Sequence, residues 1–147
     1  MSYLVDTNIL LRSCQLLHPM YPVAVGAVSN LLQQGNKLYI APQNIVEFWN
    51  VSTRPLDKNG LGMTVEKTAA EVTKLEAILP LLPDVPEIHQ QWRKLVTDYD
   101  VKGVNVHDAR LVATCIIHGL THILTFNDRD FKRYQEITVV HPDTVSK

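Results

Sequence analysis

Short apolar segments alternate with longer segments of helical spacing along this chain, and no other feature limits its fold as much. The short segments are residues 3–5, 38–40, 122–125 and 137–140. Strands separated by helices pair in parallel, because a parallel pair needs a long crossover connection between its members. Helices then cover both faces of the sheet. The sequence therefore predicts an α/β fold, a three-layer α/β/α sandwich around a mostly parallel sheet of four or five strands.

Helix start and stop signals occupy the segments between these strands. Prolines in first turns and glycines after last turns predict helices at about residues 8–17, 22–34, 42–54, 64–79, 86–98 and 107–118. Residues 55–63, PLDKNGLGM, have the composition of a loop throughout. This loop is either a plain surface connection or a mobile arm beside a site.

The length of 147 residues fits a single domain, residues 1–147, with one sizeable core. No apolar run approaches the roughly 18 residues of a membrane-spanning helix, and the N-terminus lacks a signal-peptide pattern, so we expect a cytoplasmic protein with no membrane partner. Cys14 and Cys115 lie in apolar stretches and are expected to be free thiols. The formal net charge is −1, so any nucleic-acid binding must come from a local basic patch.

Five acidic residues stand at element boundaries or in apolar surroundings. They are Asp6 after the first strand, Glu47 within IVEFW, Asp108 at the start of the last helix, and Asp128 and Asp130 in the turn NDRD. Ligands of parallel sheets bind outside the carboxyl ends of the strands, where Asp6 and Asp128 fall. A helix N-terminus tolerates carboxylates and would bring Asp108 to the same rim.

Most of these acids also have a structural interpretation. Asp6 and Asp108 suit helix caps, and the acids of NDRD suit a turn. Glu47 differs, because no lysine or arginine lies three or four residues away on its helix. Gathered together, like charges repel one another unless a cation neutralises them, and hard oxygen ligands favour Mg²⁺ or Mn²⁺. The chemistry that follows is metal-assisted hydrolysis of a phosphodiester.

Four stretches resemble, in order, the acidic motifs of the PIN domain family, and especially the VapC-type toxins of bacterial toxin–antitoxin pairs. They are VDTNILLR at residues 5–12, IVEFWNVSTRP at 45–55, HDARLVAT at 107–114 and LTFNDRDF at 124–131, and they span nearly the whole chain. The resemblance implies a PIN-like nuclease domain and an endoribonuclease dependent on Mg²⁺ or Mn²⁺. It further implies an RNA substrate, a homodimer and, for a toxin, an antitoxin protein as partner.

The resemblance also implies roles for individual residues. Four acids would be both catalytic and metal-binding: Asp6, Glu47, Asp108 and Asp128. Asp130 would be an additional or substitute metal ligand; family members differ in where the last acid falls, and we favour Asp128. Asn8 matches the polar residue that supports the first aspartate, and Thr125 matches the hydroxyl residue of the late strand.

Binding of RNA would also require basic residues near the acids. Six lie within a few residues of the acidic motifs: Arg12, Arg54, Arg110, Arg129, Lys132 and Arg133. They predict a positive rim that holds phosphates without reading the RNA sequence, although each also suits a plain surface position. His107, beside Asp108, is either a proton-transfer group or a structural residue.

Several other functions lack the residues that they need. A phosphatase of the haloacid dehalogenase type needs a second acid two residues after the first, where this chain has Asn8. Gly119 separates His118 from His122, which argues against a helical zinc pair. No nucleophile elbow, Walker A or dinucleotide-binding motif occurs. The remaining alternative to an enzyme is a non-catalytic or inhibited domain that binds RNA or a protein.

The helical stretch of residues 8–32 has more apolar surface than one buried stripe requires. This excess predicts core packing together with a homodimer face, or a groove for an antitoxin segment.

Overall fold

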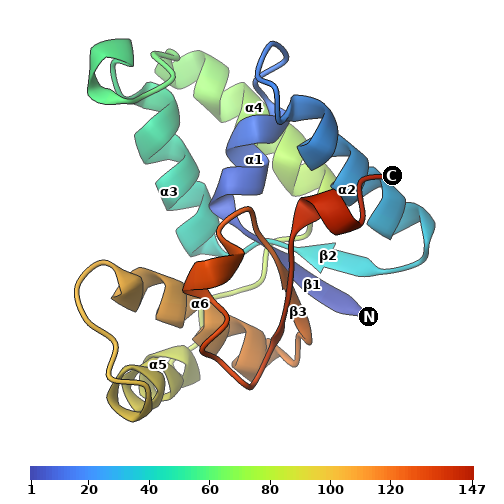
Figure 1. The fold of residues 1–147 in the computed structure, drawn as a ribbon. Coiled ribbons are helices and arrows are strands. Elements are labelled where there is room, and N and C mark those ends of the chain that lie inside the picture. Colours follow the sequence, from blue (N-terminus) through green and yellow to red (C-terminus); the bar gives the residue numbers. More distant parts are fainter.

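The computed structural model describes all 147 residues and contains a four-stranded sheet (Figure 1). Its strands are β1 Ser2–Val5, β2 Lys37–Tyr39, β3 His122–Leu124 and β4 Thr138–Val140. They are arranged in the order β2-β1-β3-β4, and every pairing is parallel. The predicted parallel sheet is confirmed, at the lower of the two expected strand counts.

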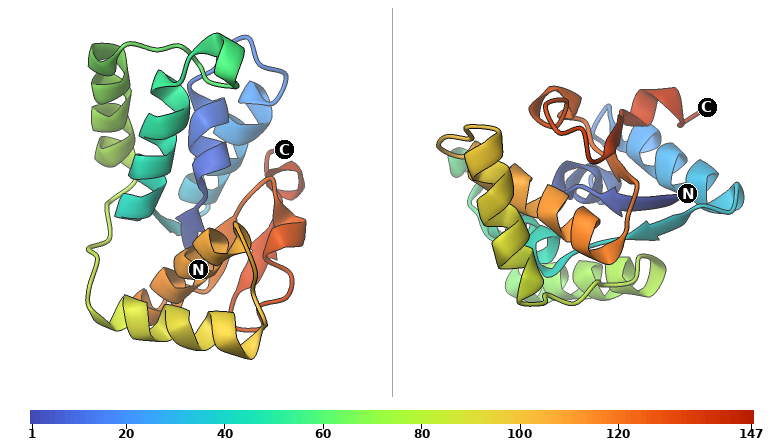
Figure 2. Two further views of the ribbon diagram at one scale, coloured as in Figure 1. Left: turned by 90° about the vertical axis from the view of Figure 1, so that its left-hand side faces the viewer. Right: turned by 90° about the horizontal axis from the view of Figure 1, so that it is seen from below.

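Six α-helices and three short 3-10 helices connect the strands. The α-helices are α1 Thr7–Ser13, α2 Tyr21–Gln33, α3 Pro42–Thr53, α4 Val65–Ile78, α5 Glu87–Asp98 and α6 Asn105–His118; the 3-10 helices are η1 Leu56–Lys58, η2 Asp128–Asp130 and η3 Pro142–Thr144. The first four α-helices lie on one side of the sheet, and α5 and α6 lie on the other (Figures 1 and 2). The three-layer α/β/α arrangement is therefore confirmed. None of these helices has both the length and the apolar character needed to cross a membrane.

The two faces of β1 explain how the layers are held together. Successive side chains of a strand point to opposite faces of the sheet. Tyr3 and Val5 accordingly belong to a buried cluster with residues of α1 to α4 such as Phe48, whereas Leu4 belongs to a second cluster with α6 residues such as Leu111. Burial of both faces accounts for the continuous apolar character of this strand.

The strand order reverses between β1 and β3. From β1 the chain passes first to β2 on one side and returns later to β3 on the other, so the carboxyl ends of β1 and β3 lie side by side. Val5 pairs with Leu124, and the amide of Asp6 donates to the carbonyl oxygen of Leu124 at 2.9 Å. Asp6 and Thr125, which are 119 residues apart, therefore meet at the point where parallel α/β sheets commonly bind ligands.

Two predicted helix boundaries are wrong. The first helix ends at Ser13 rather than near residue 17, because the chain turns at residues 14–20 and leaves Leu16 and Leu17 exposed. The last helix begins at Asn105, so Asp108 lies within the first turn and is not its cap. The apolar spacing of the first helix continues past the residue at which the helix ends. The apolar spacing of the last helix begins after the residue at which the helix starts.

The loop of residues 55–63 folds back onto the end of α3. The amides of Leu61, Gly62 and Met63 donate to the carbonyl oxygens of Val51, Arg54 and Ser52 at 2.8–3.0 Å. These bonds satisfy carbonyl groups that a helix end leaves without partners. The loop is thus a hydrogen-bonded extension of α3, as expected for a structural connection.

Gly60 gives a test of this packing, because a Cβ atom at this position would lie 1.9 Å from the carbonyl oxygen of Arg54. We expect Gly60→Ala to lower the free energy of unfolding by about 2–4 kcal/mol, since the backbone must move to relieve the overlap. Chemical denaturation measures the change. Asp57→Ala, an exposed change in the same loop, is the control and should alter it by less than about 0.5 kcal/mol. An equal effect of both variants would contradict the tight packing.

Candidate metal centre

Asp6 is the buried centre of the polar edge, by which we mean the side of the sheet where β1 and β3 end. Only 6% of its surface is exposed, and its backbone is extended before α1. One carboxylate oxygen accepts from the amide of Thr7 at 2.8 Å, and the other accepts from the hydroxyl of Thr125 at 2.7 Å. Asp6 is therefore both the N-cap of α1 and a carboxylate fixed between α1 and the end of β3.

Asn8 holds this arrangement from the other side. Its amide nitrogen donates to the hydroxyl oxygen of Thr125 at 3.2 Å, and its amide oxygen accepts from the backbone nitrogen of Phe126 at 3.2 Å. Thr125 thus contacts Asp6 directly and Asn8 contacts it through Thr125, while their supporting roles stay a prediction.

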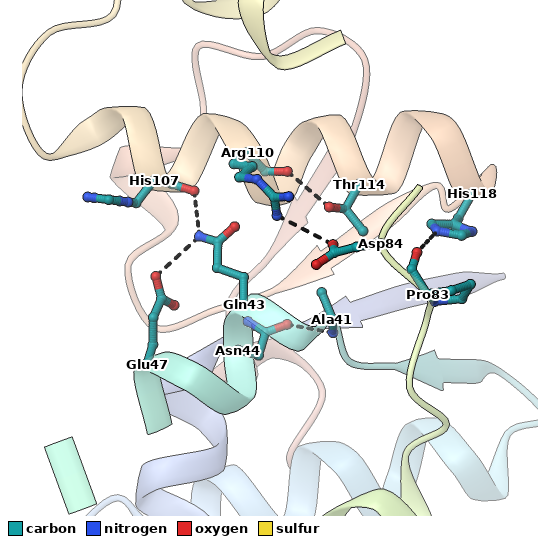
Figure 3. A network of polar contacts seen from close by, with 10 residues as sticks. All are labelled: Ala41, Gln43, Asn44, Glu47, Pro83, Asp84, His107, Arg110, Thr114 and His118. Carbon is teal, nitrogen blue, oxygen red and sulfur yellow. Dashed lines mark hydrogen bonds and ion pairs between the residues drawn. The ribbon is translucent and has the colours of Figure 1, made fainter. Parts of the chain in front are cut away.

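Glu47 reaches the same edge from α3. One carboxylate oxygen accepts from the hydroxyl of Thr7 at 2.7 Å, and the other accepts from the amide nitrogen of Gln43 at 3.2 Å. Gln43 lies one helical turn before Glu47 and also donates to the backbone carbonyl of His107 at 2.8 Å, across the gap to α6 (Figure 3). No ion pair involves Glu47. The Glu47 carboxylate, which lies among apolar residues in the sequence, is thus held by neutral hydrogen-bond donors.

The pKa values of Asp6 and Asp108 show that several acids lie within range of one another's charge. The pKa of Asp6 is raised to about 6: burial is the largest cause, the hydrogen bonds from Thr125 and Thr7 lower it, and the charges of Glu47 and Asp130 add to the rise. Burial also raises the pKa of Asp108 to about 7, with added repulsion from Asp6, Asp130 and Glu47. Asp108 in α6 therefore lies within electrostatic range of the acids that follow β1 and that belong to α3 and η2.

The two acids of η2 have different surroundings. Asp128 forms an ion pair with Lys132 at 3.4 Å. Partial desolvation acts to raise the pKa of Asp128, but the contacts with Lys132 outweigh it, and the pKa lies below its usual value. Asp130 instead acts on both Asp6 and Asp108 through its charge. Although the sequence favoured Asp128 as the fourth acid, these electrostatic contacts favour Asp130.

The donor set fits a hard divalent cation. The carboxylates act on one another through their charges, which raise the pKa values of Asp6 and Asp108, and this is the environment that Mg²⁺ or Mn²⁺ stabilises. No three His, Cys, Asp or Glu side chains lie close enough together to form a ligand cluster in this structure. The chemistry of these side chains therefore suits the ion.

The six basic residues expected near the site divide into two groups. Arg133 lies close enough to Asp108 to lower its pKa, and Arg110 lines a pocket of about 520 Å³ beside Glu47 and pairs with Asp84 at 3.5 Å (Figure 3). In the other group, Lys132 pairs with Asp128, Arg12 is bonded to Gln15, Arg54 caps α3 and Arg129 is exposed.

Three residues of this network were not predicted as site residues. Thr7, Gln43 and Asn44 contact Glu47 directly or through one another. Gln43 and Asn44 precede Glu47 by four and three residues, and this helical spacing places them on its face. The contact of Thr7 with Glu47 joins α1 to α3 over 40 residues of sequence, so no local pattern could reveal it. The side chain of His107 is exposed, and the residue meets the network through its carbonyl group.

The fold and the site together define a three-layer parallel α/β domain with acidic residues at its switch point. A family model described as PIN domain matches residues 3–137. The chain therefore belongs to the PIN domain family, which is a family of nucleases. Comparison with curated protein sequences gives no match.

Solved structures of similar fold include several toxin–antitoxin complexes. VapBC2 from Rickettsia felis, solved with a DNA fragment of its promoter, has a TM-score of 0.71 at 16% identity and covers 96% of this chain and 98% of that chain. VapBC-1 from nontypeable Haemophilus influenzae has a TM-score of 0.69 at 15% identity, covering 97% and 99%. A toxin–antitoxin complex from Klebsiella pneumoniae has a TM-score of 0.65 at 20% identity, covering 95% and 97%. At these identities the likeness shows the shared fold.

The raised pKa values predict how stability depends on pH in metal-free protein. Between about pH 4 and pH 7 the folded state binds more protons than the unfolded state, so the free energy of unfolding falls as the pH rises. We expect Asp108→Asn to flatten this slope and to raise the free energy of unfolding by about 1–2 kcal/mol at pH 8, allowing for solvent screening. Chemical denaturation of both proteins in EDTA at pH 4 and pH 8 measures the difference in the free energy of unfolding. A lower stability of the Asp108→Asn variant at pH 8 would refute the repulsion.

The effects of the two acids of η2 can be distinguished by measuring the pKa of Asp108. NMR of its carboxyl carbon gives this pKa. Asp130→Asn removes a charge that repels the Asp108 carboxylate, so we expect it to lower this pKa. Asp128→Asn should leave the pKa of Asp108 in place, because Asp128 is not among the groups that shift it. The reverse pattern would restore Asp128 as the fourth acid of the edge.

Proposed function

We propose that this protein is an endoribonuclease that depends on Mg²⁺ or Mn²⁺ and hydrolyses RNA phosphodiester bonds as the toxin of a toxin–antitoxin pair. The observation that carries the proposal is the set of acids whose charges act on one another at the switch point of a PIN domain. Asp6, Glu47 and Asp108 are the proposed catalytic and metal-binding residues. Asp130 completes the set, and Asp128 is kept as the alternative that the sequence favoured.

The acids of the polar edge and their neutral neighbours would have separate roles. The acids would hold the ion, which when bound lowers the pKa of an attacking water and balances the charge that develops on the phosphate. Thr125 and Asn8 hold the Asp6 carboxylate in one orientation, and Gln43 holds Glu47 at a constant position relative to α6. Such preorganisation removes the need to reorient these groups during the reaction.

Basic residues beside the acids support a nucleic-acid substrate. Arg133 is close enough to act on Asp108, and Arg110 shares a pocket with Glu47. Their guanidinium groups are suited to phosphate oxygens, and a local pair of this kind suffices where the net charge of −1 gives no general attraction. RNA in the cytoplasm is the proposed substrate, and its phosphates would be held without base recognition.

An apolar groove supports an antitoxin partner. It lies between α1, α2 and α4, has a volume of about 400 Å³, and is bordered by the exposed residues Val25, Leu32 and Ile78. The similar folds from Rickettsia felis and Haemophilus influenzae were solved as VapBC complexes. We propose that apolar side chains of an antitoxin occupy this groove, and that two copies of the toxin form a homodimer through other apolar surface.

Cleavage of a mixed pool of structured RNAs tests the activity. We expect the purified protein to cut RNA with Mg²⁺ or Mn²⁺ and not with EDTA. Asp6→Asn should lower the rate at least a hundredfold, because it removes a central carboxylate without altering side-chain size. Asp57→Asn, on an exposed loop, is the matched control and should cut normally. Tight metal binding without cleavage under any condition would instead favour a non-catalytic RNA- or protein-binding domain.

A further inference from the structure

A second chain of hydrogen bonds leads to Glu47 from the interior of the protein. The amide nitrogen of Asn44 lies 3.2 Å from the hydroxyl oxygen of Thr7, and this hydroxyl lies 2.7 Å from a carboxylate oxygen of Glu47. Asn44 is fully buried and Thr7 is 8% exposed, so water does not compete for these groups. Three residues from two helices thus form one continuous chain.

The contact of Asn44 with Ala41 determines the direction of every hydrogen bond in this series. The amide oxygen of Asn44 accepts from the backbone nitrogen of Ala41 at 2.8 Å (Figure 3). The NH₂ group of Asn44 must therefore be the side that faces Thr7. Thr7 receives a hydrogen from this NH₂ group, and its own single hydrogen is left for Glu47. Glu47 can only accept at this oxygen.

The second oxygen of Glu47 is held in the same way. The amide nitrogen of Gln43 has two hydrogens, and its two neighbours are acceptors, namely the Glu47 carboxylate and the carbonyl oxygen of His107. Both carboxylate oxygens therefore accept from neutral donors. Neutral donors orient a carboxylate without cancelling its charge, in contrast to Lys132, which pairs with Asp128.

The same arrangement occurs at Asp6. Asn8 donates to Thr125 at 3.2 Å, Thr125 donates to Asp6 at 2.7 Å, and the amide oxygen of Asn8 is engaged by a backbone nitrogen. The site thus contains two chains of identical chemistry, each running from an asparagine amide through a threonine hydroxyl to a carboxylate. Both use a residue of α1: one joins α1 to Thr125, directly after β3, and the other joins α3 to α1.

We propose that Thr7 and Asn44 are positioning residues that hold Glu47 oriented for a divalent cation. The inference rests on the proposed metal dependence and adds two residues that act through Glu47. Groups of this kind around a metal ligand commonly change metal affinity by ten- to a hundredfold, because they fix the orientation of the ligand.

Titration calorimetry with Mn²⁺ on the full chain, stripped of metal, tests the proposal. Thr7→Val replaces the hydroxyl by a methyl group of similar size, and we expect it to weaken Mn²⁺ binding about tenfold. Thr7→Ser keeps the hydroxyl and should bind within about twofold of the wild type. Thr114→Val is the matched control, because Thr114 is also a fully buried helical threonine and donates only to the carbonyl oxygen of Arg110.

A double-mutant cycle with Glu47→Gln distinguishes positioning from general loss of structure. If Thr7 acts through Glu47, Thr7→Val should cause little further loss of Mn²⁺ affinity once Glu47 is replaced. An equal loss in both backgrounds, or a Thr7→Val protein that binds like the wild type, would overturn the proposal. Thr7→Ala serves in the same cycle if the valine variant does not fold. Absence of Mn²⁺ binding by the wild type would overturn the proposed function itself.

Discussion

The parallel pairing of β1 with β3 is the constraint on which the rest of the site depends. The two strands are separated by more than a hundred residues, and their carboxyl ends meet because the crossovers send β2 and β3 to opposite sides of β1. The amide of Asp6 continues the β1–β3 ladder by one residue. The contact of Asp6 with Thr125 then follows directly from strand register, and a shift of one residue would turn each side chain to the other face.

The acidic residues of the polar edge lower the stability of the metal-free protein. Burial and mutual repulsion raise the pKa values of Asp6 and Asp108 to about 6 and about 7, so at neutral pH the metal-free fold carries a cost from its own site. Neutral donors offset part of it, since each hydroxyl or amide that donates to a carboxylate compensates for lost hydration. A bound cation would remove the remainder, which is the usual physical reason for carboxylates to gather in one place.

The sheet, its layers and most of the acids were predictable from local patterns. Apolar segments of three or four residues between helical segments predicted the parallel sheet, and the boundary positions of Asp6 and Asp108 predicted their place at its edge. Helix ends were less predictable, because LLRSCQLL continues its apolar spacing beyond Ser13 while the chain itself turns. Spacing reports which residues prefer burial, and it does not report where backbone hydrogen bonding stops.

The sequence by itself determined the class of fold, the acidic character of the site and the family to which the chain belongs. The fold class and the acidic character follow from residue types and from spacings within single elements, and the family follows from the match of residues 3–137 to its model. Only the tertiary structure decided that Asp128 pairs with Lys132, that the charge of Asp130 acts on Asp6 and Asp108, and that neutral residues hold Glu47. Asp128 and Asp130 are two residues apart in one short turn, and only their distant neighbours distinguish them. Likewise, the bond from Thr7 to Glu47 spans 40 residues, and it exists because α1 packs against α3.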